Sequence, residues 1–113
     1  MHIREKIRGE VAVVKLEGDL LDENDTMMVQ QKVMSLKVDG MTKVVFDLEH
    51  VSRINSKGLS VLIAAFKTMR NAGGDIRFAR IDNHVNNIFV KTKLVQVFNT
   101  YETVGRALAS YAL

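Results

Sequence analysis

The sequence predicts a single α/β domain built on a mainly parallel sheet of four or five strands with flanking helices. Two observations carry this prediction: a short apolar, β-branched run at 43–48, and an amphipathic stretch at 57–71 that follows it. The same order of strand and helix continues to the end of the chain, which favours parallel pairing with right-handed crossovers. At roughly 100 to 200 residues per domain, a chain of 113 residues has room for one domain, 1–113.

The first part of the chain is typical of a β-hairpin. Residues 3–8 and 11–17 read as strands, and Gly9-Glu10 supplies the turn between them. Gly18 closes this hairpin. An acidic loop, 19–25, then leads into the first helix.

A first helix is expected to begin near Thr26, with Asn24 or Asp25 as its N-cap, and to end at Gly40. The run KVVFDL at 43–48 follows. Short, continuous apolar runs of this kind are typical of a central strand that is buried on both faces.

The clearest helical pattern lies at 57–71. Its apolar residues recur at i, i+3, i+4, i+7 and i+10: Leu59, Leu62, Ile63, Phe66 and Met69. Ser56 is a residue type that caps helices, and Gly73-Gly74 is a stop signal. A strand at 76–79, a helix at 83–92, a strand at 95–98 and a helix at 103–113 are expected after it. The predicted order is therefore ββαβαβαβα.

Composition and charge exclude several classes of protein. The chain has no Cys, which excludes disulfides, thiolate zinc sites and thiol catalysis and is compatible with a reducing cytoplasm. The N-terminus lacks the apolar core of a signal peptide. The longest apolar run, 61–66, is far below the roughly 18 residues of a membrane span. We therefore expect a cytoplasmic protein without membrane insertion.

The net charge of +3 mainly favours solubility. The concentrated basic feature is Arg4, Lys6 and Arg8, which would share one face of the first strand. Such a stripe can bind nucleic acid, or it can protect an edge strand from aggregation. Because aromatic residues do not interleave with it and Arg or Lys clusters are absent elsewhere, the second interpretation is favoured and no direct nucleic-acid binding is expected.

Residues that could carry catalysis are not arranged for it. His2, His50 and His84 are far apart, and Ser60 lacks the flanking glycines of a nucleophile elbow. The acidic residues at 22–25 lack the alternation and central Gly of a calcium loop. No enzyme activity, cofactor or metal site is expected.

Asp47 ends the predicted central strand, where ligands of open α/β sheets bind. One interpretation is a phosphate acceptor, as in response-regulator receivers. That chemistry also needs an acidic pair after the first strand to hold Mg²⁺, and the hairpin is followed only by Asp19 and Asp22. The favoured interpretation is that Asp47 shapes the adjoining loop through hydrogen bonds.

Ser56 lies where that loop enters the long helix. A capping hydroxyl there is worth about 1 kcal/mol. A phosphate would add about −1.5 to −2 charges beside Lys57 and the positive end of the helix. The fold would tolerate that charge, whereas a partner packed closely over Gly58, which has no side chain, would not.

The chain resembles the STAS family, which includes domains of sulphate transporters and anti-sigma-factor antagonists. The resemblance covers the opening hairpin with Gly18-Asp19-Leu20 and the block VVFDLEHVSRINSKGLSVLIAAFKTMRNAGG at 44–74. In the family, a strand ends in Asp, and Asp-Ser-x-Gly-Leu opens a helix that closes at a Gly pair. The matching residues are Asp47, Ser56, Gly58, Leu59 and Gly73-Gly74. A STAS-like fold is implied.

The resemblance implies a switch that binds partners. An anti-sigma factor that is also a serine kinase, of the histidine-kinase-like ATPase type, binds the unphosphorylated domain, and its capture frees a sigma factor. That kinase would phosphorylate Ser56, and a PP2C-type phosphatase would reverse it. Asn55, Lys57, Gly58 and Asp22 are the expected partner-binding residues. Because Asn55 replaces the family Asp, a constitutive module that docks on a transporter ATPase or signalling assembly remains the alternative.

Overall fold

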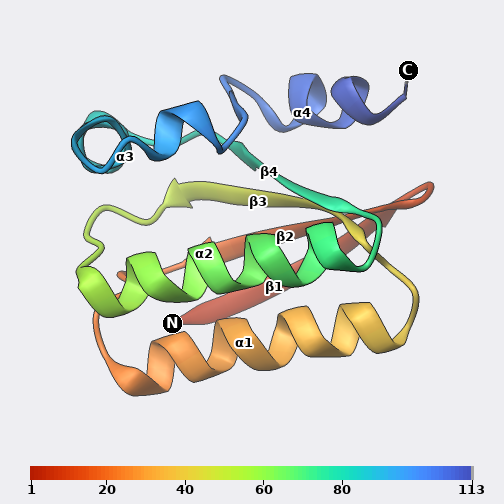
Figure 1. Cartoon of the computed structure of the whole chain (residues 1–113), viewed down its shortest axis with the longest axis horizontal. Coiled ribbons are helices and arrows are strands. Elements are labelled where there is room, and N and C mark those ends of the chain that lie inside the picture. The colour runs from red at the N-terminus through yellow and green to blue at the C-terminus, as the bar shows by residue number, and fades with distance from the viewer. Residues whose placement is uncertain (113) are drawn as a thin grey trace.

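The computed structural model describes residues 1–112, which form one sheet with helices on both faces (Figure 1). The elements are β1 (His2–Arg8), β2 (Val11–Glu17), α1 (Glu23–Val38), β3 (Lys43–His50), α2 (Ser56–Asn71), β4 (Asp75–Ala79), α3 (Asn83–Lys91), a 3₁₀ helix (Leu94–Gln96), β5 (Thr100–Tyr101) and α4 (Val104–Tyr111). The five strands lie in sequence order; β1 is antiparallel to β2, and the other neighbours are parallel. The predicted mainly parallel sheet with an N-terminal hairpin is confirmed.

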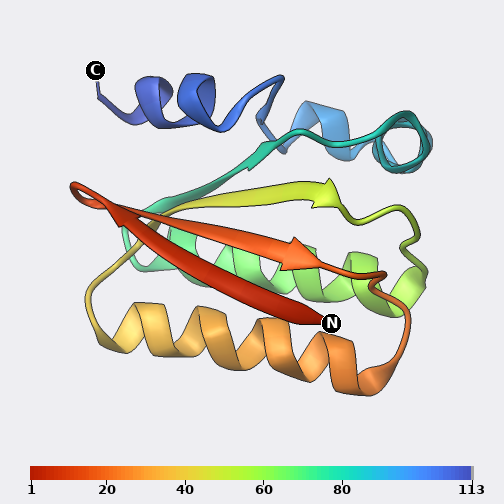
Figure 2. The same ribbon diagram turned by 180° about the vertical axis from the view of Figure 1, so that it is seen from behind.

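Side chains of β3 divide the core between the two faces of the sheet. Val44, Phe46 and Leu48 belong to the larger cluster, to which α1 and α2 contribute, whereas Val45 packs with Ala107 of α4. Figures 1 and 2 show α1 and α2 on one side of the sheet, with α2 in front of β1 and β2 in Figure 1 and behind them in Figure 2, and α4 on the other side. Since both faces of β3 are covered, its continuous apolar run is explained.

α4 covers only part of its face of the sheet. Its eight residues, at 1.5 Å each, make a helix of about 12 Å, which packs on β3, β4, β5 and part of β2. Tyr111 anchors it, because the Tyr111 hydroxyl lies 2.8 Å from the carbonyl oxygens of Val44 and Asp75. Burial raises the pKa of Tyr111. On the β1 side of this face, which α4 does not cover, lies an open groove.

The predicted strand at 95–98 is wrong. A 3₁₀ helix follows Lys93, whose φ of +62° is left-handed, and the strand pairing comes later, at Thr100–Tyr101. Val95 and Val97 have strand propensity but are exposed, while Phe98 is buried against Phe78 with ring centroids 4.5 Å apart. Burial of this aromatic ring outweighs the local β propensity.

Two predicted helix boundaries also change. α1 begins at Glu23 rather than near Thr26, and its N-cap is Asp22 instead of Asn24 or Asp25. The amide of Asp25 donates to Asp22 Oδ1 over 2.8 Å. The expected C-terminal helix begins at Val104 with Thr103 as its cap, and the last residue of the predicted range, 113, lies outside the described residues.

Candidate functional site

Two loops meet at the end of the sheet where α1 and α2 begin (Figure 1). The first, 18–22, joins β2 to α1, and the second, 51–55, joins β3 to α2. The amide of Leu20 donates to the carbonyl of Arg53 over 2.9 Å, and Leu20 forms a parallel bridge with Ile54. The pairing of β2 with β3 therefore continues into the loops and sets the starts of both helices relative to each other.

Asp19 holds the second loop to the first. Its Oδ1 accepts hydrogen bonds from the amides of Ser52 and Arg53, over 3.3 and 3.1 Å, and its Oδ2 accepts from Arg53 Nε over 2.8 Å. The Arg53 side chain, helped by the two amides and opposed by burial, lowers the pKa of Asp19. The ionised carboxylate is thus the form that stabilises the loops.

Asn55 is the N-cap of α2, so the prediction that Ser56 caps this helix is wrong. Asn55 Oδ1 accepts from the amide of Gly58 over 3.0 Å, and its Nδ2 donates to the carbonyl of Leu21 over 2.6 Å. The side-chain amide therefore caps α2 and also ties it to the loop before α1. An ionised aspartate could accept the first bond but could not donate the second.

Gly58 is buried against its own chain. A Cβ at this position would lie 2.3 Å from the carbonyl oxygen of Leu20 and 3.1 Å from Ile54 Cγ2. The expectation that its missing side chain opens the surface to a partner is therefore wrong. Gly58 lets α2 approach the Leu20 backbone, where any other residue would collide.

Ser56 and Lys57 are exposed and open α2. Within residues 1–112, Ser56 Oγ makes no hydrogen bond and Lys57 forms no ion pair. The first amides of a helix have no carbonyl partner inside it and carry its positive end. Since the first turn of α2 contains no acidic residue, its own sequence leaves that positive end uncompensated.

Ser56 lies on an open groove between α1 and α2 with a volume of about 490 Å³. Glu23 and Thr26 of α1 form the opposite wall from Lys57 and Ser60 of α2. Of the expected partner-binding residues, Asp22, Asn55 and Lys57 are exposed at this end of the molecule and Gly58 is not. The structure thus brings Ser56 and Lys57 to a surface that both helices share.

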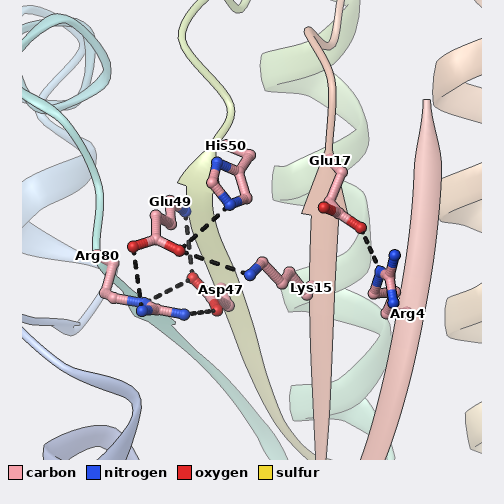
Figure 3. Close-up of polar contacts among 7 residues, drawn as sticks. All are labelled: Arg4, Lys15, Glu17, Asp47, Glu49, His50 and Arg80. Carbon is pink, nitrogen blue, oxygen red and sulfur yellow. Dashed lines mark hydrogen bonds and ion pairs between the residues drawn. The ribbon is translucent and has the colours of Figure 1, made fainter.

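Asp47 lies apart from the Ser56 groove. Its side chain is buried, pairs with the Arg80 guanidinium and accepts a hydrogen bond from the amide of Glu49 over 3.1 Å (Figure 3). The hydrogen bonds that Arg80 donates to the Asp47 carboxylate raise the pKa of Arg80, which also pairs with Glu49. Asp47 thus joins the carboxyl-terminal half of β3 to Arg80, the residue that follows β4.

Sequence reasoning missed Arg80 and Arg53 as partners of these aspartates. Arg80 directly follows β4, and its neighbour Ala79 is the register partner of Asp47. A parallel alignment of the two predicted strands could have found this pair. The Asp19–Arg53 pair has no comparable signal, because it joins two irregular loops.

Two further kinds of feature, a metal-binding cluster and a membrane-spanning helix, are absent from the described part of the chain. Among residues 1–112, no three His, Asp or Glu side chains are grouped so that they could hold a metal ion. None of the helices there has the length and hydrophobicity that a membrane span requires.

A family comparison identifies the architecture. The family model of the STAS domain matches residues 2–107. The chain belongs to the STAS family. Its match spans every strand and the first half of α4, so the Ser56 groove, Asp47 and the loops that connect them all lie within the family's domain.

Solved structures share this fold. An anti-sigma factor antagonist from Mycobacterium paratuberculosis is 22% identical, with 96% of this chain and 92% of that chain covered at a TM-score of 0.84. The Bacillus cell fate determinant SpoIIAA in its phosphorylated form is 15% identical, with 97% of this chain and 99% of that chain covered at a TM-score of 0.76. A sulfate transporter family protein from Wolinella succinogenes is 9% identical, with 93% of this chain and 87% of that chain covered at a TM-score of 0.81. At these identities the likeness is one of fold.

Proposed function

We propose that this protein is an anti-sigma-factor antagonist that is switched by phosphorylation of Ser56. The unphosphorylated chain binds an anti-sigma factor that is also a serine kinase of the histidine-kinase-like ATPase type. Capture of that kinase frees a sigma factor for transcription. A PP2C-type phosphatase restores the binding form. The protein acts in the cytoplasm as a binding module, without a cofactor or catalysis of its own.

The observation that carries this proposal is the position of Ser56. Its hydroxyl is exposed, is not used in the fold within residues 1–112, and opens a helix whose first turn has no acidic residue. A phosphate there would add about −1.5 to −2 charges at the positive end of α2. The related fold of SpoIIAA, which is known in a phosphorylated form, supports this assignment.

Phosphorylation is expected to act on the surface and to leave the fold intact. The Ser56 groove is bordered by Glu23 as well as by Lys57. A partner that packs over this groove must desolvate whatever charge it carries, and an unpaired buried charge is costly. The phosphate would therefore weaken binding through desolvation and crowding.

A second candidate function is a constitutive STAS module that docks on a transporter ATPase or a signalling assembly. Asn55 favours it, because this residue replaces the Asp that precedes the serine in the family pattern. Asn55 also serves the fold through two hydrogen bonds, so its presence can be structural. The sulfate transporter family neighbour gives this candidate a second line of support.

A kinase reaction separates the two candidates. The full chain would be incubated with ATP and the anti-sigma factor kinase encoded by the same genome, and the product would be mapped by intact-protein fragmentation mass spectrometry. We expect one phosphate, on Ser56, that is lost in Ser56→Ala and retained in Ser60→Ala, a matched change in the same groove. Phosphate on another residue, or none, would favour the constitutive module.

A further inference from the structure

β1 is the outermost strand of the sheet, and within residues 1–112 it pairs only with β2 (Figure 2). Over its seven residues, one side of the backbone is therefore open to another strand. Such an edge is a template for strand addition, in which main-chain hydrogen bonds supply affinity and alternate side chains supply specificity.

One face of β1 carries a regular row of cations. Arg4, Lys6 and Arg8 alternate along the strand, at a spacing of about 7 Å for two residues. Their register partners on β2 include Lys15 and Val13. Because Val13 packs with Ala107 of α4, the row lies on the α4 face of the sheet. The Ser56 groove lies in the layer of α1 and α2, below the opposite face.

A groove of about 670 Å³ lies on this face, between β1 and Val104, the first residue of α4. Five cations line it: Arg4, Lys6, Arg8, Lys15 and Arg80. The two carboxylates that line it are already paired, Glu5 with Lys32 and Asp47 with Arg80. The groove therefore has an excess of positive charge.

The excess is concentrated on two side chains. Arg4 pairs with Glu17, and Lys15 lies 3.5 Å from Glu49 (Figure 3). Lys6 and Arg8 form no ion pair within the range 1–112. They lie at alternate positions of the open strand, so both point toward the same side of any strand added there.

We propose that the β1 edge and this groove bind an extended acidic polypeptide segment, which adds a strand to the sheet and places carboxylates at alternate positions over Lys6 and Arg8. The acidic segment is required because the row and the groove are basic. The extended form is required because only a polypeptide backbone can pair with the open edge of β1.

The same residues disfavour other occupants. A second copy of β1 would bring its own row of Arg4, Lys6 and Arg8 opposite this one, and like charges across strands are destabilising. The groove's lining, as far as the described part of the chain forms it, contains no aromatic side chain. Single-stranded nucleic acid therefore lacks the stacking platform that it commonly uses.

The test uses the full chain and a fluorescein-labelled peptide of alternating Glu and Thr, long enough to cover β1, measured by fluorescence anisotropy at low salt. The Lys6→Glu/Arg8→Glu variant should bind at least about tenfold more weakly than wild type. Lys37→Glu/Lys91→Glu makes the same charge change on exposed helix positions and should stay within about twofold. Equal losses in the two variants would overturn the proposal, since they would indicate a net-charge effect. Thermal melts check that both variants fold.

Further arms test the occupant and the mode of binding. A peptide N-methylated at alternate backbone positions, on the edge that would pair with β1, should lose binding, and retention would overturn strand addition. Tighter binding of an oligothymidylate of equal charge, or of phosphatidylserine vesicles, would assign the groove to nucleic acid or to lipid and overturn the peptide assignment. Ser56→Asp should leave peptide binding unchanged, so this result and the kinase reaction can fail independently.

Discussion

α1 and α2 begin side by side at one end of the sheet, and their first turns differ in charge (Figure 1). α1 is capped by Asp22 and has Glu23 and Asp25 in its first turn. α2 is capped by the neutral Asn55 and has no acidic residue there. Carboxylates at a helix N-terminus compensate its positive end. The helix that lacks this compensation is the one that presents Ser56.

The two N-termini also differ in what their caps do. Asp22 accepts one hydrogen bond, from the amide of Asp25. Asn55 accepts one bond inside α2 and donates another to Leu21. The start of α2 is thus fixed to the loop before α1 by uncharged groups. This arrangement holds Ser56 in place without placing a negative charge beside it.

The largest effect is expected from Gly58→Ala. The added Cβ would collide with the Leu20 carbonyl, and overpacking of this kind typically costs about 1–3 kcal/mol. Gly105→Ala is the matched control, because Gly105 is exposed in α4 and the atom nearest to a Cβ there would be Thr103 Oγ1, 3.8 Å away. That change should stabilise by up to about 1 kcal/mol. Urea unfolding measures the free energy of unfolding of both variants. Changes of the same sign would contradict the close approach of Gly58 to the Leu20 carbonyl.

The second prediction exchanges the two caps. Asn55→Asp should lower the free energy of unfolding by up to about 1 kcal/mol, since it loses the bond to Leu21 and brings two oxygens together. The new charge at the positive end of α2 offsets part of this loss. Asp22→Asn should change it by no more than about 0.5 kcal/mol, because Asn and Asp cap helices equally well. Chemical denaturation of both variants at neutral pH gives the comparison. If the Asn55→Asp protein were more stable than wild type, the claim that the Asn55 bond to Leu21 stabilises the fold would be wrong.

Sequence patterns predicted much of the fold because the strongest periodicities coincide with deep burial. The strand at 43–48 can be predicted because its apolar run is continuous, and the helix at 57–71 because it follows one period over its whole length. The failure at 95–98 arose because the burial of Phe98 depends on the rings of Phe66 and Phe78, which lie on earlier elements of the chain. Local propensity holds no information on that contact.

The residues of the candidate site also differ in whether the local sequence predicts their roles. Ser56 could be located from the motif around it, which is a local property of the chain. The role of Gly58 could not, because it is set by the Leu20 backbone, which the fold brings into contact. Asn55 was recognised as a departure from the family pattern, but its bond to Leu21 spans 34 residues and appears only in three dimensions.

The third prediction concerns pH and the loop that aligns the two helix starts. The folded-state pKa of Asp19 is depressed below its ordinary value of 3.8. Stability from the ionised side chain is therefore complete above that ordinary value and is lost as pH falls through the folded-state pKa. Asp19→Asn should be less stable than wild type at neutral pH, and the gap should narrow in acid. A gap independent of pH in denaturation curves would exclude a role for the charge.

The smallest stability effects are expected at Ser56 itself. Since its hydroxyl makes no hydrogen bond within residues 1–112, Ser56→Ala should change stability by no more than about 0.5 kcal/mol. Ser56→Asp should stabilise by about 0.3–1 kcal/mol through the positive end of α2. Ser60→Asp, one turn further along, should gain less, because the helix-dipole effect fades beyond the first turn. Thermal unfolding at low salt would rank the three, and a large loss in Ser56→Ala would show a structural role.

The most direct measurement is a calorimetric titration of the anti-sigma factor kinase with the unphosphorylated chain and with the chain phosphorylated at Ser56. We predict that the phosphate weakens binding by at least about tenfold, which corresponds to about 1.4 kcal/mol, while the melting temperature of the phosphorylated chain is maintained or raised. Equal affinities for the two forms would contradict the account, because the charge at the start of α2 would then have no effect on the partner.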